Sequence, residues 1–304
     1  MKKDVNKWQI NTGWSGYYDD KYNAYQTRAS NQYYYSKPID GGTYTFSANH
    51  GIKLNNNGGF LNFSFDYLNQ AKTFRQVADT NVWTNKNALP LNASRRAFGD
   101  ASVATIGAMF NMEVPTSASG KTTVYAFGGF NNKASDAYAY TRNYSWSPQR
   151  FPVDAAGNLV FDPNIMKISE DGETYYNPHI QTKINDVSLA AGVKGKMTKG
   201  WNWDFSNTIG RNDFHYYGDK TYNASMIITP GTMRQTHFDD GGFNFLQNTT
   251  NLDFSKSFSS IAEGLNLGIG AEFRYENYQI YKGEEASYAN YNPNPIPYAN
   301  LGGD

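Results

Sequence analysis

Tyrosines and arginines gather in one polar stretch of the chain, residues 133–183. Within it, "DAYAYTRNYSWSPQR" is followed after a gap by "ETYYNPH". Aromatic rings can stack on a sugar or a flat ligand, and guanidinium groups pair with carboxylates. The candidate ligand contacts are Tyr138, Tyr140, Arg142, Tyr144, Trp146, Arg150, Tyr175 and Tyr176. The alternative is that these tyrosines pack the segment together or lie at a membrane interface.

Histidines and carboxylates, which could bind a metal or catalyse a reaction, do not occur at the spacings that such chemistry requires. The histidines that could bind a metal are His179, His215 and His237, but none belongs to a pair at ligand spacing. The segment "HFDDGGF" (237–243) lacks most ligands of a calcium loop. The carboxylates of Glu272 and Glu276 would lie about 13 Å apart along a strand, too far for glycosidase chemistry. We therefore predict no metal, no cofactor and no enzymatic activity.

Composition narrows the class of protein further. Lysine plus arginine equals aspartate plus glutamate at 27 each, so no net charge favours a nucleic-acid partner. Cysteine is absent, which excludes disulfides and thiolate chemistry. Aromatic residues reach 16% although mean hydropathy is −0.67, and aromatic side chains are favoured in β-strands. No apolar run approaches the ~18 residues of a membrane helix.

Side-chain type alternates with few exceptions, such as Leu68, along the stretch "GGFLNFSFDYLNQ" (58–70). One side of the predicted strand carries Leu61, Phe63, Phe65 and Tyr67, and the other carries Asn62, Ser64 and Asp66. A period of two predicts a strand with one apolar and one polar face. In a soluble sandwich the apolar face would meet a second sheet. In an outer-membrane barrel it would meet lipid, and the polar face would line the lumen.

Strand-like stretches recur along the chain, whereas helical periodicity is nearly absent. They cover residues 7–18, 42–54, 58–70, 102–114, 122–132, 184–197, 201–217, 241–258 and 265–281. The charged residues on their polar sides include Asp66, Asp204, Glu272, Arg274 and Glu276. We therefore predict an all-β fold of about nine or ten antiparallel strands.

Tight and long connections alternate between these stretches. The tight ones lie near 55–59, 115–120, 198–200 and 258–264, and the long ones span roughly 19–41, 72–100, 133–183 and 216–240, with another from 283. Outer-membrane barrels have short periplasmic turns and long extracellular loops, whereas a sandwich has no cause to segregate its loops. Aromatic residues beside the tight turns, Phe60, Trp201, Trp203 and Phe258, are predicted to form an interfacial girdle.

Nine amphipathic strands cannot form a stable open sheet by themselves. Two edges would be unpaired and the apolar face uncovered. The first residues, "MKKDVNKWQI", lack the apolar region of a signal peptide, and the chain ends within a loop-like segment, "NPIPYANLGGD". We therefore expect residues 1–304 to form part of a barrel domain whose other strands lie elsewhere.

Several stretches resemble the TonB-dependent receptors of Gram-negative outer membranes, with a composition similar to members from Bacteroidota. The resemblance is carried by "GGFLNFSFDYLNQAKTFRQ", "GGFNFLQNTTNLDFSKSF" and "GLNLGIGAEFRYENYQIYKGEEASY", and it extends over roughly residues 42–290. It implies a 22-stranded antiparallel transmembrane β-barrel around an N-terminal plug domain, of which this chain would lack the plug and the C-terminal strands.

The resemblance also implies a function. Such receptors import iron–siderophore complexes, haem, cobalamin or oligosaccharides with energy from the TonB complex. The expected partners are outer-membrane lipid, the plug and remaining strands of the same receptor, the TonB complex and a small-molecule or oligosaccharide ligand. The residues expected to face the lumen are Asn62, Ser64, Asp66, Asp204, Glu272, Arg274 and Glu276. Two alternatives stay open: a surface β-sandwich for binding or adhesion, and a passive porin-type barrel.

Overall fold

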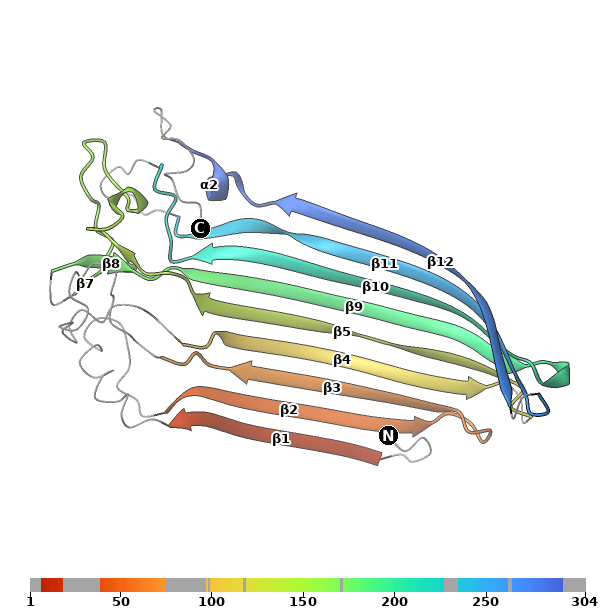
Figure 1. Ribbon diagram of the computed structural model, residues 1–304. Coiled ribbons are helices and arrows are strands. Elements are labelled where there is room, and N and C mark those ends of the chain that lie inside the picture. Colours follow the sequence, from red (N-terminus) through yellow and green to blue (C-terminus); the bar gives the residue numbers. More distant parts are fainter. Residues whose placement is uncertain are drawn as a thin grey trace.

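The computed structural model describes residues 7–18, 39–74, 97, 99–116, 119–169, 172–226, 235–261 and 264–291. Most of two predicted long connections, 19–41 and 72–100, lies outside the described residues. One antiparallel sheet dominates this part of the chain (Figure 1). Its nine strands are β1 (Lys7–Tyr18), β2 (Ile39–Lys53), β3 (Phe60–Gln70), β4 (Ser102–Pro115), β5 (Thr122–Tyr138), β9 (His179–Lys196), β10 (Asn202–Asp219), β11 (His237–Phe258) and β12 (Leu265–Lys282).

The sheet is a meander in which sequence neighbours pair. The strand order is β1-β2-β3-β4-β5-β9-β10-β11-β12, so the prediction of about nine antiparallel strands is confirmed. In the described part of the chain the sheet is open, because β1 and β12 each pair with a single strand. Closure into a barrel and a total of 22 strands stay predictions.

Short and long connections lie at opposite ends of the strands, as the sequence predicts (Figure 1). The short turns fall between β2 and β3, β4 and β5, β9 and β10, and β11 and β12. In the first of them the Asn55 side-chain oxygen accepts hydrogen bonds from the backbone N–H groups of Asn57 and Gly59, at 3.0 and 2.8 Å. Gly58 has φ +89°, a conformation that glycine adopts readily. We call this end the turn end and the other the loop end.

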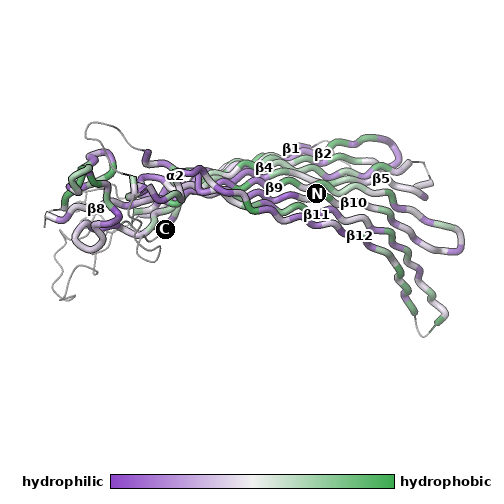
Figure 2. Tube along the Cα trace, turned by 90° about the horizontal axis from the view of Figure 1, so that it is seen from above, coloured by the Kyte–Doolittle hydropathy of each residue, from purple (hydrophilic) through white to green (hydrophobic). Residues whose placement is uncertain are grey.

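The pairing register divides the side chains between two faces, because directly opposed residues in neighbouring strands point the same way. Phe65, Phe205 and Phe273 share what we call the first face. All seven residues predicted to face a lumen share the second face: Asn62, Ser64, Asp66, Asp204, Glu272, Arg274 and Glu276. Figure 2 shows the alternation along the strands and the bend of the last strands away from the first.

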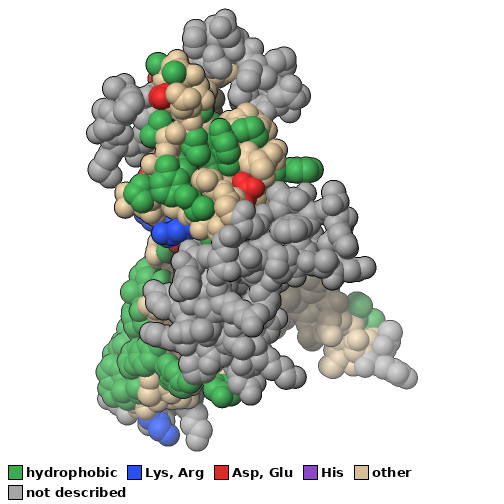
Figure 3. Space-filling view, turned by 90° about the vertical axis from the view of Figure 1, so that its left-hand side faces the viewer, with side chains coloured by type: hydrophobic (Ala, Val, Ile, Leu, Met, Phe, Trp, Pro, Cys, Tyr) green, Lys and Arg blue, Asp and Glu red, His purple; other side chains and the backbone are tan. Residues whose placement is uncertain are grey.

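The first face exposes its apolar side chains. Phe205 is 50% exposed, Ile269 65% and Phe273 68%. Further exposed residues on this face include Ile10, Trp14, Phe63, Phe130, Val187, Leu189 and Leu252. Seen from the loop end, hydrophobic side chains cover one side of the sheet near its first strands (Figure 3). In water such a surface is unfavourable, since soluble monomers rarely expose apolar patches beyond a few hundred Å².

The polarity of the two faces reverses toward the loop end. A row of cross-strand partners, Asn132, Asn185, Asp213, Asn244 and Gln279, crosses the first face, and Asn132 donates to Asn185 at 2.6 Å. The next first-face row beyond it contains Lys183, His215 and Tyr281. The second face there is aromatic, with Phe214, Tyr216, Phe243 and Tyr278. From β5 to β12 the first face is therefore apolar at the turn end and polar at the loop end, whereas on β4 and β3 the same row continues with Ile106 and Tyr67.

The described residues of the segment 139–178, which we call the cap, fold into a small unit between β5 and β9. Its three-stranded sheet has the order β6 (Arg142–Asn143), β8 (Thr174–Tyr176), β7 (Lys167–Ile168), and a 3₁₀ turn, η4, spans Pro148–Arg150. Its buried core consists of Phe151, Ile165, Met166 and Tyr176, with Tyr144, Leu159 and Tyr222 packed against it. A short helix, α2 (Glu285–Tyr288), lies at the same end of the molecule.

Some sequence expectations need correction. The strands extend beyond their predicted limits at the loop end, so the connection expected over 133–183 is only 139–178. Phe60 does not belong to an aromatic girdle on the first face, because its register places it on the second face, where it is 2% exposed. The Lys256 ammonium group lies over the rings of Trp201 and Phe258, and the girdle stays a prediction for these two residues and Trp203. None of the helices in the described residues is long and apolar enough to cross a membrane.

Candidate ligand-binding site

A pocket of about 620 Å³ lies on the second face at the loop end, and we call it the loop pocket. Its walls come from the cap, from the ends of β9, β10 and β11, and from the segment that contains α2. The lining residues that carry charge or an aromatic ring include Arg142, Arg150, Tyr176, Tyr216, Tyr222 and Asp240. Three of the eight predicted ligand contacts, Arg142, Arg150 and Tyr176, therefore meet in one cavity.

The core of the cap fixes the position of Tyr176. Its ring packs edge-to-face on Phe151 and Tyr222, with centroids 5.0 and 5.3 Å away. Its hydroxyl donates to the backbone oxygen of Arg150 at 3.0 Å, which holds the end of the 3₁₀ turn. Burial raises the pKa of Tyr176 to about 12, so the hydroxyl is protonated, and able to donate, at neutral pH.

Arg142 and Arg150 place two positive charges beside the loop pocket. Burial lowers the pKa of Arg142, and the nearby charge of Arg150 lowers it further. Arginine stays protonated despite such shifts, so both guanidinium groups are cations. Asp240, also in the lining, supplies a negative charge from β11.

The other five predicted contacts lie outside the lining of this pocket. Tyr140 and Trp146 are exposed on the cap, and Tyr144 packs against its core. Tyr175 is 0% exposed, and Tyr138 packs against His179 and Lys72 at the end of β5. Tyr144 thus fits the packing alternative. Ligand contact by each of the eight stays a prediction.

An aromatic row, which sequence reasoning missed, runs along the second face from the loop pocket. Tyr216 lies 4.6 Å from Phe214, Phe214 stacks on Phe243 at 5.3 Å, and Phe243 lies 5.8 Å from Tyr278. These rings belong to β10, β11 and β12. The sequence signal for these rings is the alternation of aromatic residues in "DFHYY" and "GGFNF". It was not used because it places the rings on the face that is predicted to be polar.

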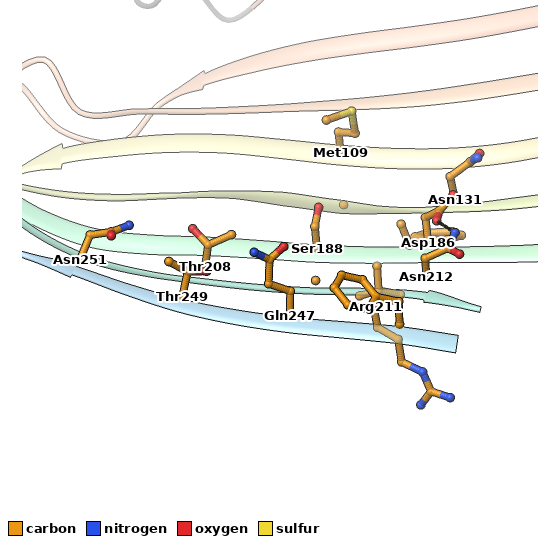
Figure 4. A pocket seen from close by; sticks show the side chains of 15 residues that line it. Met109, Asn131, Asp186, Ser188, Thr208, Arg211, Asn212, Gln247, Thr249 and Asn251 are labelled. Carbon is orange, nitrogen blue, oxygen red and sulfur yellow. Dashed lines mark hydrogen bonds between the residues drawn. The ribbon is translucent and has the colours of Figure 1, made fainter. Parts of the chain in front are cut away.

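A second hollow of about 570 Å³, which we call the wall pocket, lies farther along the same face (Figure 4). Phe245, the strand partner of Tyr278, belongs to its lining. Its polar side chains are Asn131, Asp186, Ser188, Thr208, Asn212, Gln247, Thr249 and Asn251. Asn212 donates a hydrogen bond to Asp186. The side chain of Arg211 points away from this group of residues (Figure 4).

The residues predicted to face a lumen lie outside both pocket linings and make polar contacts of their own. Arg274 pairs with Glu272 at 2.9 Å and approaches Glu276 at 3.8 Å. Asp204 accepts a hydrogen bond from the Tyr125 hydroxyl at 2.7 Å. The three charged residues of β12 thus form a ladder of ion pairs on the second face.

One cluster near β5 and β9 offers atoms to a metal but already holds a cation. Ligand atoms of Asp136, His179 and Asp219 lie within 4.8 Å of one another. The ammonium group of Lys72 lies 2.5 Å from the Asp136 carboxylate and 3.1 Å from Nδ1 of His179. Gln181 donates to both carboxylates. Since Lys72 compensates the negative charge, the arrangement is explained as an ion-pair network.

Comparison with known proteins adds no family. A scan of the sequence against protein-family models finds no match, and no curated protein matches it significantly. What the structure defines is a class of architecture: a curved antiparallel meander with an exposed apolar face and a loop-built pocket.

Proposed function

We propose that this chain forms part of the wall of an outer-membrane transport barrel of the TonB-dependent receptor class. The segregation of short turns and long connections to opposite ends of a nine-stranded meander carries this proposal. It is the arrangement of periplasmic turns and extracellular loops in such barrels. The open edges of β1 and β12 would then pair with further strands of the same receptor.

The exposed first face supports a lipid environment. Phe205, Ile269 and Phe273 are at least half exposed, and no second sheet covers them in the described part of the chain. A β-sandwich for adhesion requires that second sheet. The polar row that begins at Asn132 would mark the outer boundary of the membrane, beyond which the strands continue into water.

Import of a scarce ligand is the activity that we propose for the complete receptor. The ligand would be an iron–siderophore complex, haem, cobalamin or an oligosaccharide, bound at the loop end and released inward with energy from the TonB complex. The loop pocket, with its arginines and the aromatic row beside it, favours this receptor function over a passive porin. A passive pore does not require a cap with a core of its own.

Membrane fractionation and uptake test the proposal. The protein, expressed from its gene in a Gram-negative host, is expected in the outer membrane and to migrate faster on gels before heating than after. Ligand uptake is expected to stop when the TonB complex is deleted. A folded monomer that is soluble without detergent would contradict the membrane assignment, and uptake that persists without TonB would indicate the porin alternative.

A further inference from the structure

The lining of the loop pocket combines two arginines with aromatic rings. Resting on the function proposed above, we propose that it binds a carboxylate-bearing ligand, with the carboxylate beside Arg142 and Arg150 and the ring or sugar body on the aromatic row. Acidic oligosaccharides and carboxylate chelates of iron share this chemistry. Both classes pair an anionic group with a larger body that can contact aromatic rings.

The two arginines provide the first part of the argument. Arg142 is 9% exposed and shares the lining of the loop pocket with Arg150, whose positive charge lowers the pKa of Arg142. Their mutual repulsion is relieved when an anion lies between them. Guanidinium groups bind carboxylates through paired, charge-assisted hydrogen bonds, which are stronger in a partly desolvated pocket.

The remaining charges of the lining orient such a ligand. Asp240 and His179 are the other ionisable side chains that belong to the pocket besides the tyrosines. The Asp240 carboxylate repels a second anionic group and can accept a hydrogen bond from a ligand hydroxyl. The pocket therefore suits a ligand whose negative charge is at one end and whose neutral donors are at the other.

The aromatic row extends the site beyond the pocket. It begins at Tyr216, which lines the loop pocket, and reaches Tyr278, the strand partner of Phe245 in the wall pocket. Tyr278 is 56% exposed, so its ring is available for stacking. The wall pocket continues with amides and hydroxyls, which match the hydroxyl groups of a sugar. A ligand that leaves the loop pocket along this row meets groups it can bind.

Calorimetric titration tests the proposal with three probes: tetragalacturonate, ferric citrate and neutral maltotetraose. The protein is expressed from its gene and extracted from membranes in detergent. At least one acidic probe is expected to bind, and maltotetraose at least tenfold more weakly. Binding of only tetragalacturonate identifies an acidic sugar as the source of the carboxylate, and binding of only ferric citrate identifies an iron chelate. Equal binding of maltotetraose would overturn the proposal.

Substitutions of Arg150 then test whether its side chain binds the carboxylate. Arg150→Gln is expected to weaken the acidic probe at least tenfold, whereas Arg150→Lys retains part of the affinity. Arg211→Gln, the same change on the opposite face of the sheet, is the matched control and is expected to leave affinity unchanged. Unchanged affinity in Arg150→Gln, or an equal loss in Arg211→Gln, contradicts the proposal.

Heat-dependent gel mobility is measured on every preparation to separate the two proposals. If the wild-type barrel assembles and no acidic probe binds, the carboxylate proposal fails and the proposed membrane function stands. If the barrel does not assemble, the proposed function itself fails. Should Arg150→Gln disturb the cap, Arg142→Gln provides the second variant, with a loss of tetragalacturonate or ferric citrate binding of at least tenfold expected.

Discussion

The wall and the cap bury their apolar side chains in different ways. In the wall, Phe205 and Phe273 project from one face of a single sheet and stay exposed. In the cap, Phe151 and Met166 are each 1% exposed within a core made by one short segment. The cap is thus a small domain-like unit with a core of its own, whereas the wall leaves apolar side chains exposed on one face.

The reversal of polarity along the wall strands makes the same distinction within single strands. On β9 the first face carries Leu189 near the middle and Asn185 and Lys183 nearer the loop end. The face that carries the apolar residues therefore changes along a single strand. This change is expected if the turn-end part of the strand faces lipid and the loop-end part faces water.

The largest effect is expected inside the cap. Phe151→Ala removes the most buried aromatic ring of its core and is expected to cost about 3–5 kcal/mol of local stability. Amide hydrogen exchange measured by mass spectrometry should show faster exchange over residues 139–178 and unchanged protection in β9 to β12. An equal loss of protection in the wall would mean that cap and wall are one cooperative unit.

A pair of adjacent substitutions tests the wall. Phe65→Arg places a charge on the first face, which is expected to cost about 2–4 kcal/mol in lipid, whereas Ser64→Arg places it on the polar second face. The assembled fraction, measured by heat-dependent gel mobility, should fall much more in Phe65→Arg. Similar losses in both variants would argue against a lipid-facing first face.

Two substitutions on the first face of β9 test whether the polar row marks the membrane surface. Leu189→Arg lies within the apolar part of β9 and is expected to cost about 2 kcal/mol or more, whereas Asn185→Arg lies in the polar row and should cost about 0–1 kcal/mol. Urea titration of the protein in lipid vesicles measures both. If Asn185→Arg is the costlier change, the polar row does not mark the membrane surface.

The smallest effect concerns the contact between the cap and the β10–β11 connection. Tyr222→Phe keeps the ring beside Tyr176 but loses the hydrogen bond from its hydroxyl to Asp162, which measures 3.3 Å. A loss of about 0.5–1.5 kcal/mol is expected, visible as modestly faster exchange in the cap. Tyr222→Ala, which also removes the ring, should have a larger effect, and equal effects would show that the ring contributes nothing.

Much of the fold follows from period-two alternation, because each wall strand has one apolar and one polar side over its turn-end half. The sequence predicted all nine strands and the positions of the four short turns. It missed the loop-end extensions, such as residues 133–138 and 179–183. There both faces carry polar or aromatic residues, so alternation no longer distinguishes strand from loop.

The candidate site was predicted less completely. Arg142, Arg150 and Tyr176 were singled out by residue type alone, and the structure brings them together. Sequence could not separate them from Tyr175, the strand neighbour of Tyr176, which is fully buried. The partners in the pocket, Tyr216 and Asp240, come from distant strands, and only the three-dimensional arrangement places them beside the cap.

The meander order has a consequence for how the molecule forms. Four strand pairs, among them β2–β3 and β11–β12, are closed by short turns, and their ends meet at little cost in loop entropy. The β5–β9 pair must instead close across the whole cap, residues 139–178. Contacts between segments distant in sequence slow folding. The hairpins before and after the cap are therefore expected to form early. Once the cap has formed its own core, the chain between β5 and β9 is shorter in effect, and the two halves of the sheet can pair more easily.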